Sequence, residues 1–385
     1  MRTCILLFVL LLSLSTNSIT GFRFPDPDHD VSNHLLNFTS YSSPWDYFKN
    51  FTGCQIGEER NGLAKLKQYF HRFGYIRDIP ISNFTDNFDD SFEKALRIYQ
   101  KNFNLNQTGI LDDQTLQQIQ RPRCGVADII DGASSMHSGK TTADSHHHGD
   151  STTKFHSVAH YAFFPGQPKW RPRNRRLTYG FLPQNNLPDT VKLTFANAFK
   201  RWAEVTPLSF VETEFYSTAD IRIGFFSGDH GDGEPFDGTL GTLAHAFSPP
   251  NGRFHLDGAE DWIVDGDAST ATIKSAVDLE SVAVHEIGHL LGLGHSSVEE
   301  SIMYPTISSR KKKVVLRDDD IQGIQVLYGG NPNYNGTSLI PSSTTTQSHQ
   351  EREESSNGGV HNLNIRSCWW AYSFFVVLCY SILLM

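Results

Sequence analysis

The segment with the strongest chemical signal is Val284–His295, which reads VHEIGHLLGLGH. His285 and His289 are four residues apart, so on a helix they share one face and can present ring nitrogens to one cation about 2 Å away. Gly292 lets such a helix end in a sharp turn, which returns His295 as a third ligand. Three protein ligands leave a fourth coordination position open, which is typical of a catalytic zinc ion.

Glu286 stands beside these ligands, where its carboxylate can reach a water molecule on the zinc ion. Zinc lowers the pKa of such a water toward ~7, and a carboxylate can take its proton and pass it to a leaving amine. Met303, eight residues after His295, lies where the extended zincin motif places its Met-turn. The pattern predicts hydrolysis of peptide bonds without an acyl-enzyme, with Glu286 as general base.

Residues 228–262 form a second region that is dense in histidine and acidic residues. Three imidazoles and a carboxylate, enough for a closed structural zinc site, are offered by His230, Asp232, His245 and His255. Hard oxygen donors suited to calcium are Asp237, Asp257 and Glu260. A polar glycine-rich loop with scattered histidines would have the same composition, and spacing alone leaves both interpretations open. The metal interpretation gains weight because bound metal would supply folding free energy that disulfides do not.

Few cysteines are available for cross-links. Cys4 lies in the N-terminal apolar run and two of the five cysteines lie in the C-terminal one, which leaves Cys54 and Cys124. A secreted chain with two cysteines is not a disulfide scaffold, so a lone thiol is free for a chemical task.

The elements that must position the zinc motif follow from periodicity. From residue 163 the residue pattern predicts strands at 177–181, 210–214 and 221–226, with a helix over 189–205 between the first two. A further helix leads from Asp278 into the zinc motif, and a late helix ends near Tyr328. This order predicts an α+β domain.

An earlier region, about 53–120, has helical periodicity. Leu63, Leu66 and Phe70 fall on one helical face, and further helices are expected over 91–103 and 113–119. These segments predict a small helical bundle. Residues 129–160 are rich in Ser, Thr, Gly, Asp and His and are expected to be a flexible connector, in which the run 146–148 is better explained as solvated linker than as a metal site.

Both ends of the chain carry apolar runs. Residues 1–21 have the short basic start, apolar run and polar cleavage region of a secretory signal peptide. Five glycosylation sequons agree with passage through the secretory pathway: Asn37, Asn50, Asn83, Asn106 and Asn335.

The net charge of −9, with no basic face or aromatic stacking motif, argues against a nucleic-acid partner.

The C-terminal run, within 358–385, follows small residues and a polar spacer and stops without basic residues. This is the pattern of a GPI-attachment signal, with Asn357 as the attachment residue and 330–357 as a Ser/Thr-rich stalk. The alternative is a retained transmembrane tail, for which the run is slightly short. The GPI interpretation places the protein on the extracellular face of the cell membrane.

With these residues in place, the chain resembles the matrix metalloproteinases (matrixins, a metzincin family), particularly plant-type members that lack a haemopexin domain. The resemblance covers roughly 53–329, and Ser296 after His295 is similar to matrixins rather than to other zincin families. It implies a helical prodomain within a propeptide of 22–160. A metzincin catalytic domain, with a mixed twisted sheet and three helices, would follow over 161–329.

The resemblance also implies roles for individual residues. Cys124, within the segment 122–128, would supply a thiolate at the fourth zinc position of an inhibited zymogen. The second region would provide the structural zinc ligands and a calcium site that adds backbone oxygens of Gly238, Leu240 and Thr242. The loop 247–254 departs from the pattern, because it is short and lacks an aspartate just before His255; a further calcium site involving Asp220 is therefore not supported.

Residues 164–170 resemble the start of a mature matrixin, so an activating protease would cut near His160–Tyr161, and the new amine would pair with Asp319. The basic run 173–176 resembles a convertase site but lies inside the catalytic domain, so we interpret it as the start of a strand. The run 310–313 is expected to be a solvated loop. The resemblance further implies a preference for a hydrophobic side chain just after the cut.

Together these features predict a secreted, cell-surface-anchored zinc endopeptidase that is made as a cysteine-switch zymogen and acts on extracellular proteins. The competing hypothesis is a non-catalytic, zinc-stabilised binding module of the cell surface. Glu286 and Cys124 argue against that module, because it needs neither.

Overall fold

The computed structural model describes residues 23–24, 43–136, 161–171 and 175–336. The signal segment 1–21, Asn37, the histidine run 146–148, Asn357 and the C-terminal apolar run lie outside these residues. None of the helices in the described ranges is long and apolar enough to span a bilayer.

The first part is built from helices around an aromatic core. They are η1 (Asp46–Phe51), α2 (Leu63–Arg72), η2 (Ile81–Asn83), α3 (Asp90–Asn102) and α4 (Asp113–Ile119). Asp89 begins α3 by accepting a hydrogen bond from Phe92 N (2.9 Å), and Asp112 does the same for α4 from Thr115 N (2.8 Å). Cys54 is buried in this core as a free thiol, so the bundle is held by packing rather than by a cross-link.

The second part is a six-stranded mixed sheet with helices. In spatial order its strands are β1 (Arg123–Cys124), β7 (Thr242–Ala246), β8 (Arg253–Asp257), β6 (Ile221–Phe226), β4 (Arg176–Phe181) and β5 (Ser209–Glu212). All neighbouring strands are parallel except the antiparallel pair β7 and β8. The predicted α+β class is therefore confirmed, and the strand β1 comes from the segment that carries Cys124.

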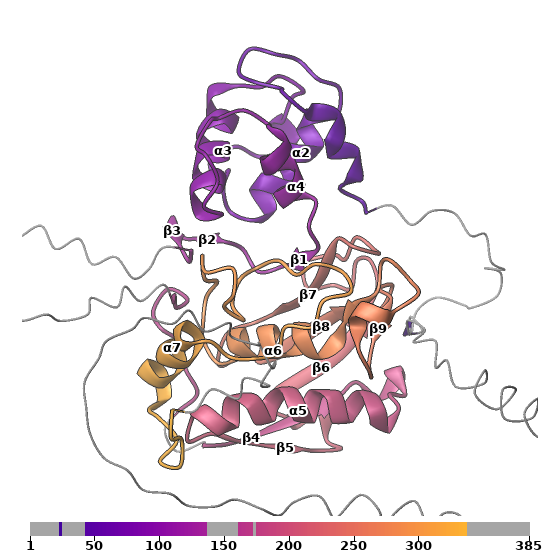
Figure 1. Cartoon of the computed structure of the whole chain (residues 1–385), viewed down its shortest axis with the longest axis vertical. Coiled ribbons are helices and arrows are strands. Elements are labelled where there is room, and N and C mark those ends of the chain that lie inside the picture. Colours follow the sequence, from indigo (N-terminus) through magenta and orange to yellow (C-terminus); the bar gives the residue numbers. More distant parts are fainter. Residues whose placement is uncertain (1–22, 25–42, 137–160, 172–174, 337–385) are drawn as a thin grey trace, which may run out of the picture. The chain divides into compact units, whose positions relative to one another are not determined.

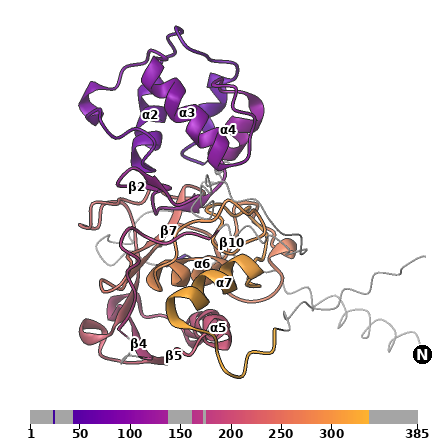
Figure 2. The same cartoon turned by 90° about the vertical axis from the view of Figure 1, so that its left-hand side faces the viewer.

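Three α-helices accompany this sheet: α5 (Asp189–Val205), α6 (Leu279–Leu290) and α7 (Asp318–Tyr328). Figures 1 and 2 show α5 and α6 running close to each other beside the strands. Trp202 of α5 is fully buried and its Nε1 donates to Val284 O of α6 (2.9 Å), which fixes the helix that bears the zinc motif. Short elements complete the domain: η3 (Pro183–Asn185), η4 (Tyr216–Thr218), η5 (Ala268–Thr270) and the parallel pair β9 (Trp262–Ile263) and β10 (Val277–Asp278).

The expected connector from residue 129 is wrong for its first residues. β2 (Ile129–Ile130) and β3 (Ala133–Ser134) form an antiparallel hairpin, and Met136 after it is fully buried. The turn consists of Asp131 and Gly132, both with positive φ (50° and 81°), which is the Asp-Gly turn that favours a two-residue hairpin. The prediction overlooked this signal because the surrounding composition is polar.

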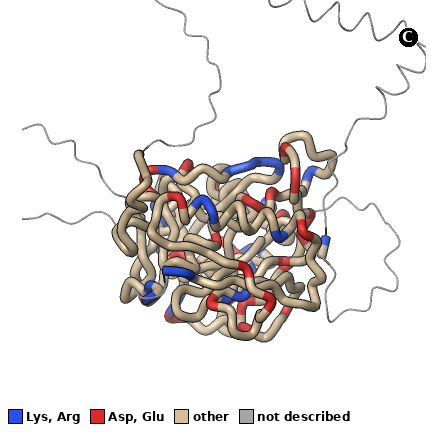
Figure 3. The backbone as a smooth tube through the Cα atoms, turned by 90° about the horizontal axis from the view of Figure 1, so that it is seen from below, with Lys and Arg blue, Asp and Glu red and all other residues tan. Residues whose placement is uncertain are grey.

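In Figure 3 acidic and basic positions are interspersed along the described chain.

Candidate active site

Helix α6, which carries the first part of the zinc motif, lies in the interior of the sheet part. Asp278 begins it by accepting from Ser281 N (2.8 Å), and every residue from Leu279 to Leu290 is buried. Gly292 ends it with φ 104°, and a Cβ at this position would lie 2.2 Å from Pro168 O. Only glycine fits here, so the turn that returns His295 to the site depends on it.

The three histidine rings are oriented by their Nδ1 atoms. His285 Nδ1 contacts Ile302 O (2.7 Å) and His289 Nδ1 contacts Leu293 O (2.8 Å), so both Nδ1 atoms donate. Their Nε2 atoms then carry lone pairs that face each other at 3.1 Å. His295 Nε2 is buried without any hydrogen-bond partner. Three converging lone pairs in a buried site repel one another, and a cation among them removes that repulsion.

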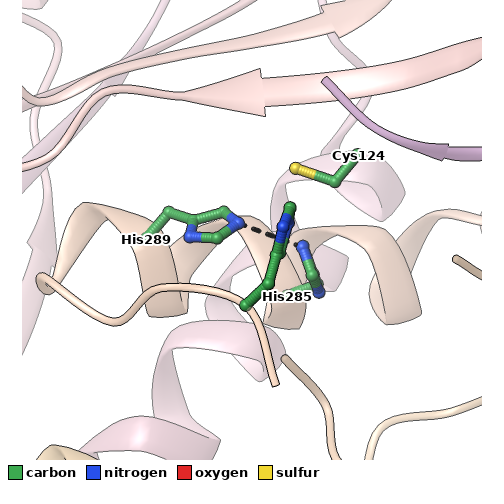
Figure 4. A group of neighbouring side chains, drawn as sticks. Cys124, His285 and His289 are labelled. Carbon is green, nitrogen blue, oxygen red and sulfur yellow. Dashed lines mark hydrogen bonds between the residues drawn. The ribbon is translucent and has the colours of Figure 1, made fainter. Parts of the chain in front are cut away.

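Cys124 completes this group. One ligand atom each from Cys124, His285, His289 and His295 lies within 4.8 Å of the others, and all four residues are buried. Figure 4 shows the Cys124 sulfur directed toward the histidine rings of α6. Burial and the adjacent Glu286 carboxyl raise the pKa of the Cys124 thiol well above its usual value. A thiolate here therefore needs a cation beside it, and the set of three imidazoles and one thiolate suits zinc.

Glu286 is fully buried next to these ligands. Neither of its carboxylate oxygens accepts a hydrogen bond of good geometry. Burial raises its pKa to about 8, an effect that the nearby Cys124 side chain partly opposes. A carboxyl group held without a partner beside a metal cluster is poised to exchange protons.

Met303 packs against α6 at Gly288, between His285 and His289. A Cβ on Gly288 would come within 2.2 Å of Met303 Sδ, so the turn of α6 between the two histidines rests on this side chain. Asp320 of α7, 1% exposed, holds the backbone at Met303: one oxygen accepts from Met303 N (3.1 Å), the other from Ile302 N (2.9 Å). Sequence reasoning missed Asp320, since the residues of the Met303 segment that it holds lie 17 to 19 positions earlier in the chain.

The segment that carries Cys124 is held on two sides. On one side Arg123 N donates to Gly241 O (3.1 Å) and Gly125 N to Ala244 O (2.8 Å), which extends the sheet beyond β7. On the other side Cys124 N donates to Pro305 O (2.9 Å). An extended chain thus lies between the sheet edge and the residues after Met303.

A buried ion pair reinforces this arrangement. Arg123 and Asp128 are both fully buried and form two hydrogen bonds, of 2.7 and 3.0 Å. Burial alone would raise the pKa of Asp128, but the Arg123 guanidinium and His295 lower it to about 2. Its carboxylate also accepts from His295 Nδ1 at 2.9 Å. Sequence reasoning assigned no role to Asp128, because the contact joins residues 167 positions apart.

A cavity adjoins the cluster on the side of α6. Its walls include His285, Glu286, Leu243, Tyr304 and Lys313. Lys313 is partly buried, and burial lowers its pKa to about 8. The prediction that 310–313 is a solvated loop is therefore wrong for Lys313, whose chain packs over the Tyr304 ring with Nζ 5.4 Å from its centroid.

The second metal region also converges. Its four residues each place a ligand atom within 4.8 Å of the others: His230, Asp232, His245 and His255. Three imidazole nitrogens meet one oxygen of Asp232, at 3.0, 2.8 and 2.7 Å. Phe226 and Phe236 stack on His230 and screen the group from water. The donor set fits a closed tetrahedral zinc site.

The acidic side chains expected to bind calcium surround the loop 237–242. Asp257 accepts from Gly238 N (3.0 Å), Glu260 from Leu240 N (2.7 Å) and Asp237 from Thr242 N (2.7 Å). Burial raises the pKa of Asp257 to about 6 and that of Glu260 well above its usual value. No ion pair joins these three carboxylates to a basic side chain of the described chain, and one oxygen of Glu260 is buried without a partner. Buried, uncompensated carboxylates fit a hard cation such as calcium.

Other predicted positions fall as follows. The four sequon asparagines in the described ranges are all exposed: Asn50, Asn83, Asn106 and Asn335. Asp319 accepts from Ser296 Oγ (2.6 Å). The Asp220 carboxylate accepts from Thr178 N and Oγ1 (2.8 and 2.9 Å). Arg176 is the first residue of β4.

Comparison with known proteins agrees with this geometry. The Matrixin family (Peptidase_M10) matches residues 169–329, and the family PG_binding_1, a peptidoglycan-binding domain, matches residues 59–119. Metalloendoproteinase 2-MMP of Arabidopsis thaliana is 55% identical over 349 residues, 90% of each chain. Metalloendoproteinase 5-MMP of the same plant is 52% identical over 93% of each chain. Metalloendoproteinase 1 of Glycine max is 49% identical over 73% of this chain and 87% of its own.

The likeness to these relatives extends through both the helical part and the sheet part, and the converging ligand sets suit the zinc and calcium that matrixins use. The resemblance stated from the motifs is thereby confirmed. The protein is a zinc metalloendopeptidase with a prodomain, and the chain belongs to the matrixin family.

Proposed function

We propose that this matrixin is made as a cysteine-switch zymogen. In this zymogen, the catalytic zinc is held by His285, His289 and His295. Cys124 fills the fourth coordination position of the zinc until the propeptide is removed. The convergence of these four ligand atoms to within 4.8 Å carries the proposal, because Cys124 lies before the matched matrixin region, which begins at residue 169 and contains the three histidines. A binding module would have no use for a thiol at this point.

Zinc, when bound, activates water and polarises the scissile carbonyl. Glu286 then takes the proton from the attacking water and returns it to the leaving amine. Its burial favours this, since a raised pKa makes the Glu286 carboxylate a stronger base than an exposed carboxylate. Gly241 O, Ala244 O and Pro305 O would hold an extended substrate, since they now hold the Cys124 segment.

The remaining ions have a structural role in this proposal. His230, Asp232, His245 and His255 bind the second zinc, and the carboxylates of Asp237, Asp257 and Glu260 bind calcium. Two of the three carbonyls expected to join them accept hydrogen bonds in the structure: Leu240 O from Ser43 Oγ (2.8 Å) and Gly238 O from Gly241 N (3.3 Å). Bound metal would stabilise loops of a domain without disulfides.

Secretion and anchoring are part of the same proposal. The signal peptide 1–21 directs the chain into the secretory pathway, sugars are added at the sequons, and a GPI anchor at Asn357 holds the protein outside the cell. Exposure of Asn50, Asn83, Asn106 and Asn335 supports glycosylation there. An activating protease that cuts near His160–Tyr161 would start the activity toward extracellular proteins.

The decisive experiment is activation of the purified zymogen. A mercurial reagent or limited proteolysis should release peptidase activity that a hydroxamate chelator blocks, and Cys124→Ser should be active without treatment. Absence of activity from a folded, zinc-loaded protein under all three conditions would favour the non-catalytic binding module. Release from cells by a phosphatidylinositol-specific phospholipase C tests the anchor separately.

A further inference from the structure

Phe24, at the start of the described chain, packs into the core of the sheet domain. Phe24 is 5% exposed and belongs to the same core cluster as Phe225 of β6. The two rings stack with centroids 3.8 Å apart and an interplanar angle of 28°. Phe24 N also donates to Gly258 O (3.3 Å). A residue of the prosegment therefore contributes a side chain to the hydrophobic core of the other domain.

Arg23 adds an ion pair at the same place. Its Nε donates to Asp261 Oδ1 (2.8 Å), and Asp261 is 4% exposed. The second oxygen of this carboxylate accepts from Ser275 Oγ. No other basic side chain of the described residues forms an ion pair with Asp261. Arg23 and Phe24 thus combine a charge-assisted hydrogen bond, a backbone hydrogen bond and a buried aromatic ring.

These contacts are separate from those of Cys124. β1, which carries Cys124, lies at one edge of the sheet, and β7 and β8 lie between it and β6. Gly258 and Asp261 lie between β8 and β9. Between the two attachment points the prosegment folds around a hydrophobic core of its own. Two attachments joined by a folded body reinforce each other, because holding one keeps the other at high local concentration.

We propose that Arg23 and Phe24 form a second docking point of the propeptide, here called the N-terminal clasp, which binds Phe225, Gly258 and Asp261. The clasp holds the propeptide on the catalytic domain after the connector is cut, so that release requires loss of both attachments. This inference rests on the proposed zymogen, in which removal of residues 1–21 leaves Arg23 next to the new N-terminus. The surface formed by Phe225, Gly258 and Asp261 therefore binds a segment of the same chain, Arg23 and Phe24.

The test uses the full secreted chain with Glu286→Ala, so that self-cleavage does not interfere. Limited treatment with a lysine-specific endopeptidase cuts the connector, in which Lys140 and Lys154 lie, and spares the Arg23–Phe24 bond. Gel filtration with mass spectrometry then measures how much propeptide stays bound. The parent should retain it. Phe24→Ala and Arg23→Glu should each increase the dissociation rate at least about tenfold, whereas Phe24→Leu should retain most of the binding. Phe215→Ala, which removes an aromatic ring that is 73% exposed, is the matched control.

Equal retention by the parent, Phe24→Ala and Arg23→Glu overturns the clasp. Arg23→Glu carries the test alone if Phe24→Ala is not secreted. Because the readout is mass rather than peptide hydrolysis, the two proposals fail differently. Mercurial activation is measured in parallel on the same chain with Glu286 intact. Equal retention by the clasp variants together with normal activation of that chain contradicts only the docking point. Retention that depends on Phe24, together with no activity from the chain with Glu286 intact, would contradict only the proposed function.

Discussion

The Asp128 carboxylate of the prosegment accepts a hydrogen bond from Nδ1 of His295 at 2.9 Å while it is paired with Arg123. An outer carboxylate fixes the tautomer and orientation of a metal-binding histidine and makes its other nitrogen a better ligand. The other two histidines of the cluster use backbone carbonyls for this purpose. In the proposed zymogen, one support of the zinc site would therefore belong to the segment that activation removes.

Arg123→Ala should weaken latency. The substitution leaves the buried Asp128 carboxylate without its cation, and breaking a buried pair typically costs about 3–5 kcal/mol. We expect the uncut zymogen to show peptidase activity on a quenched peptide, and the purified propeptide region to unfold at lower temperature. Arg121→Ala is the matched control, because its partner Glu299 is exposed. Unchanged latency of Arg123→Ala would contradict the prediction.

Glu286→Ala should abolish hydrolysis without emptying the site. General-base groups contribute about 10²–10⁴-fold to rate, and the three histidine ligands are untouched by this change. Single-turnover assays on the activated protein and zinc analysis by mass spectrometry measure the two effects. Substantial turnover by the zinc-loaded variant would contradict the role of Glu286 as general base.

Gly288→Ala should damage the site by crowding. The new methyl group would lie 2.2 Å from Met303 Sδ and 3.2 Å from Trp202, both of them buried. Overpacking of this kind costs about 1–3 kcal/mol. A lower melting temperature together with reduced activity is expected. Met303→Ala combined with Gly288→Ala should recover part of the stability, and no recovery would contradict direct contact as the cause.

Lys313→Met should change how stability depends on pH. Burial lowers the pKa of Lys313 to about 8, from an ordinary value of 10.5. Between these values the unfolded chain binds more protons than the folded one, so the contribution of Lys313 to stability rises with pH across this window. Allowing for partial exposure, the rise is about 1–2 kcal/mol. Urea unfolding from pH 7 to 10.5 should show a flatter profile for Lys313→Met, with Lys311→Met, an exposed neighbour, as control.

Removal of the structural zinc should lower the stability of the protein more than its rate of peptide hydrolysis. His245→Ala opens one of the two convergent clusters and leaves the other intact. We expect the zinc content to fall by one ion and the melting temperature to drop, whereas added zinc should restore neither. A variant with full zinc content and an unchanged melting temperature would rule out a structural zinc at this position.

Sequence reasoning worked best where one local pattern determines the structure. The predicted helices over 189–205 and 113–119 agree with α5 and α4, because apolar periodicity and, for α4, the capping Asp112 are local signals. The zinc motif could likewise be placed from its spacing. Two-residue strands such as β1 and β9 were not predicted, since their hydrogen bonds come from distant partners. The contacts of Asp128, Asp320 and Phe24 were missed for the same reason: each becomes visible only when remote segments are packed together.

The pairing of β1 with β7 has a final consequence for the activated protein. If the propeptide leaves as proposed, β7 becomes an outer strand with unpaired backbone groups, and such a strand can pair with another extended chain. Gly241 O, Ala244 O and Pro305 O can serve only one chain at a time. In the proposed zymogen, latency would thus depend on which chain occupies these carbonyls on the two sides of the cleft, and a released propeptide would compete with substrate in proportion to its concentration.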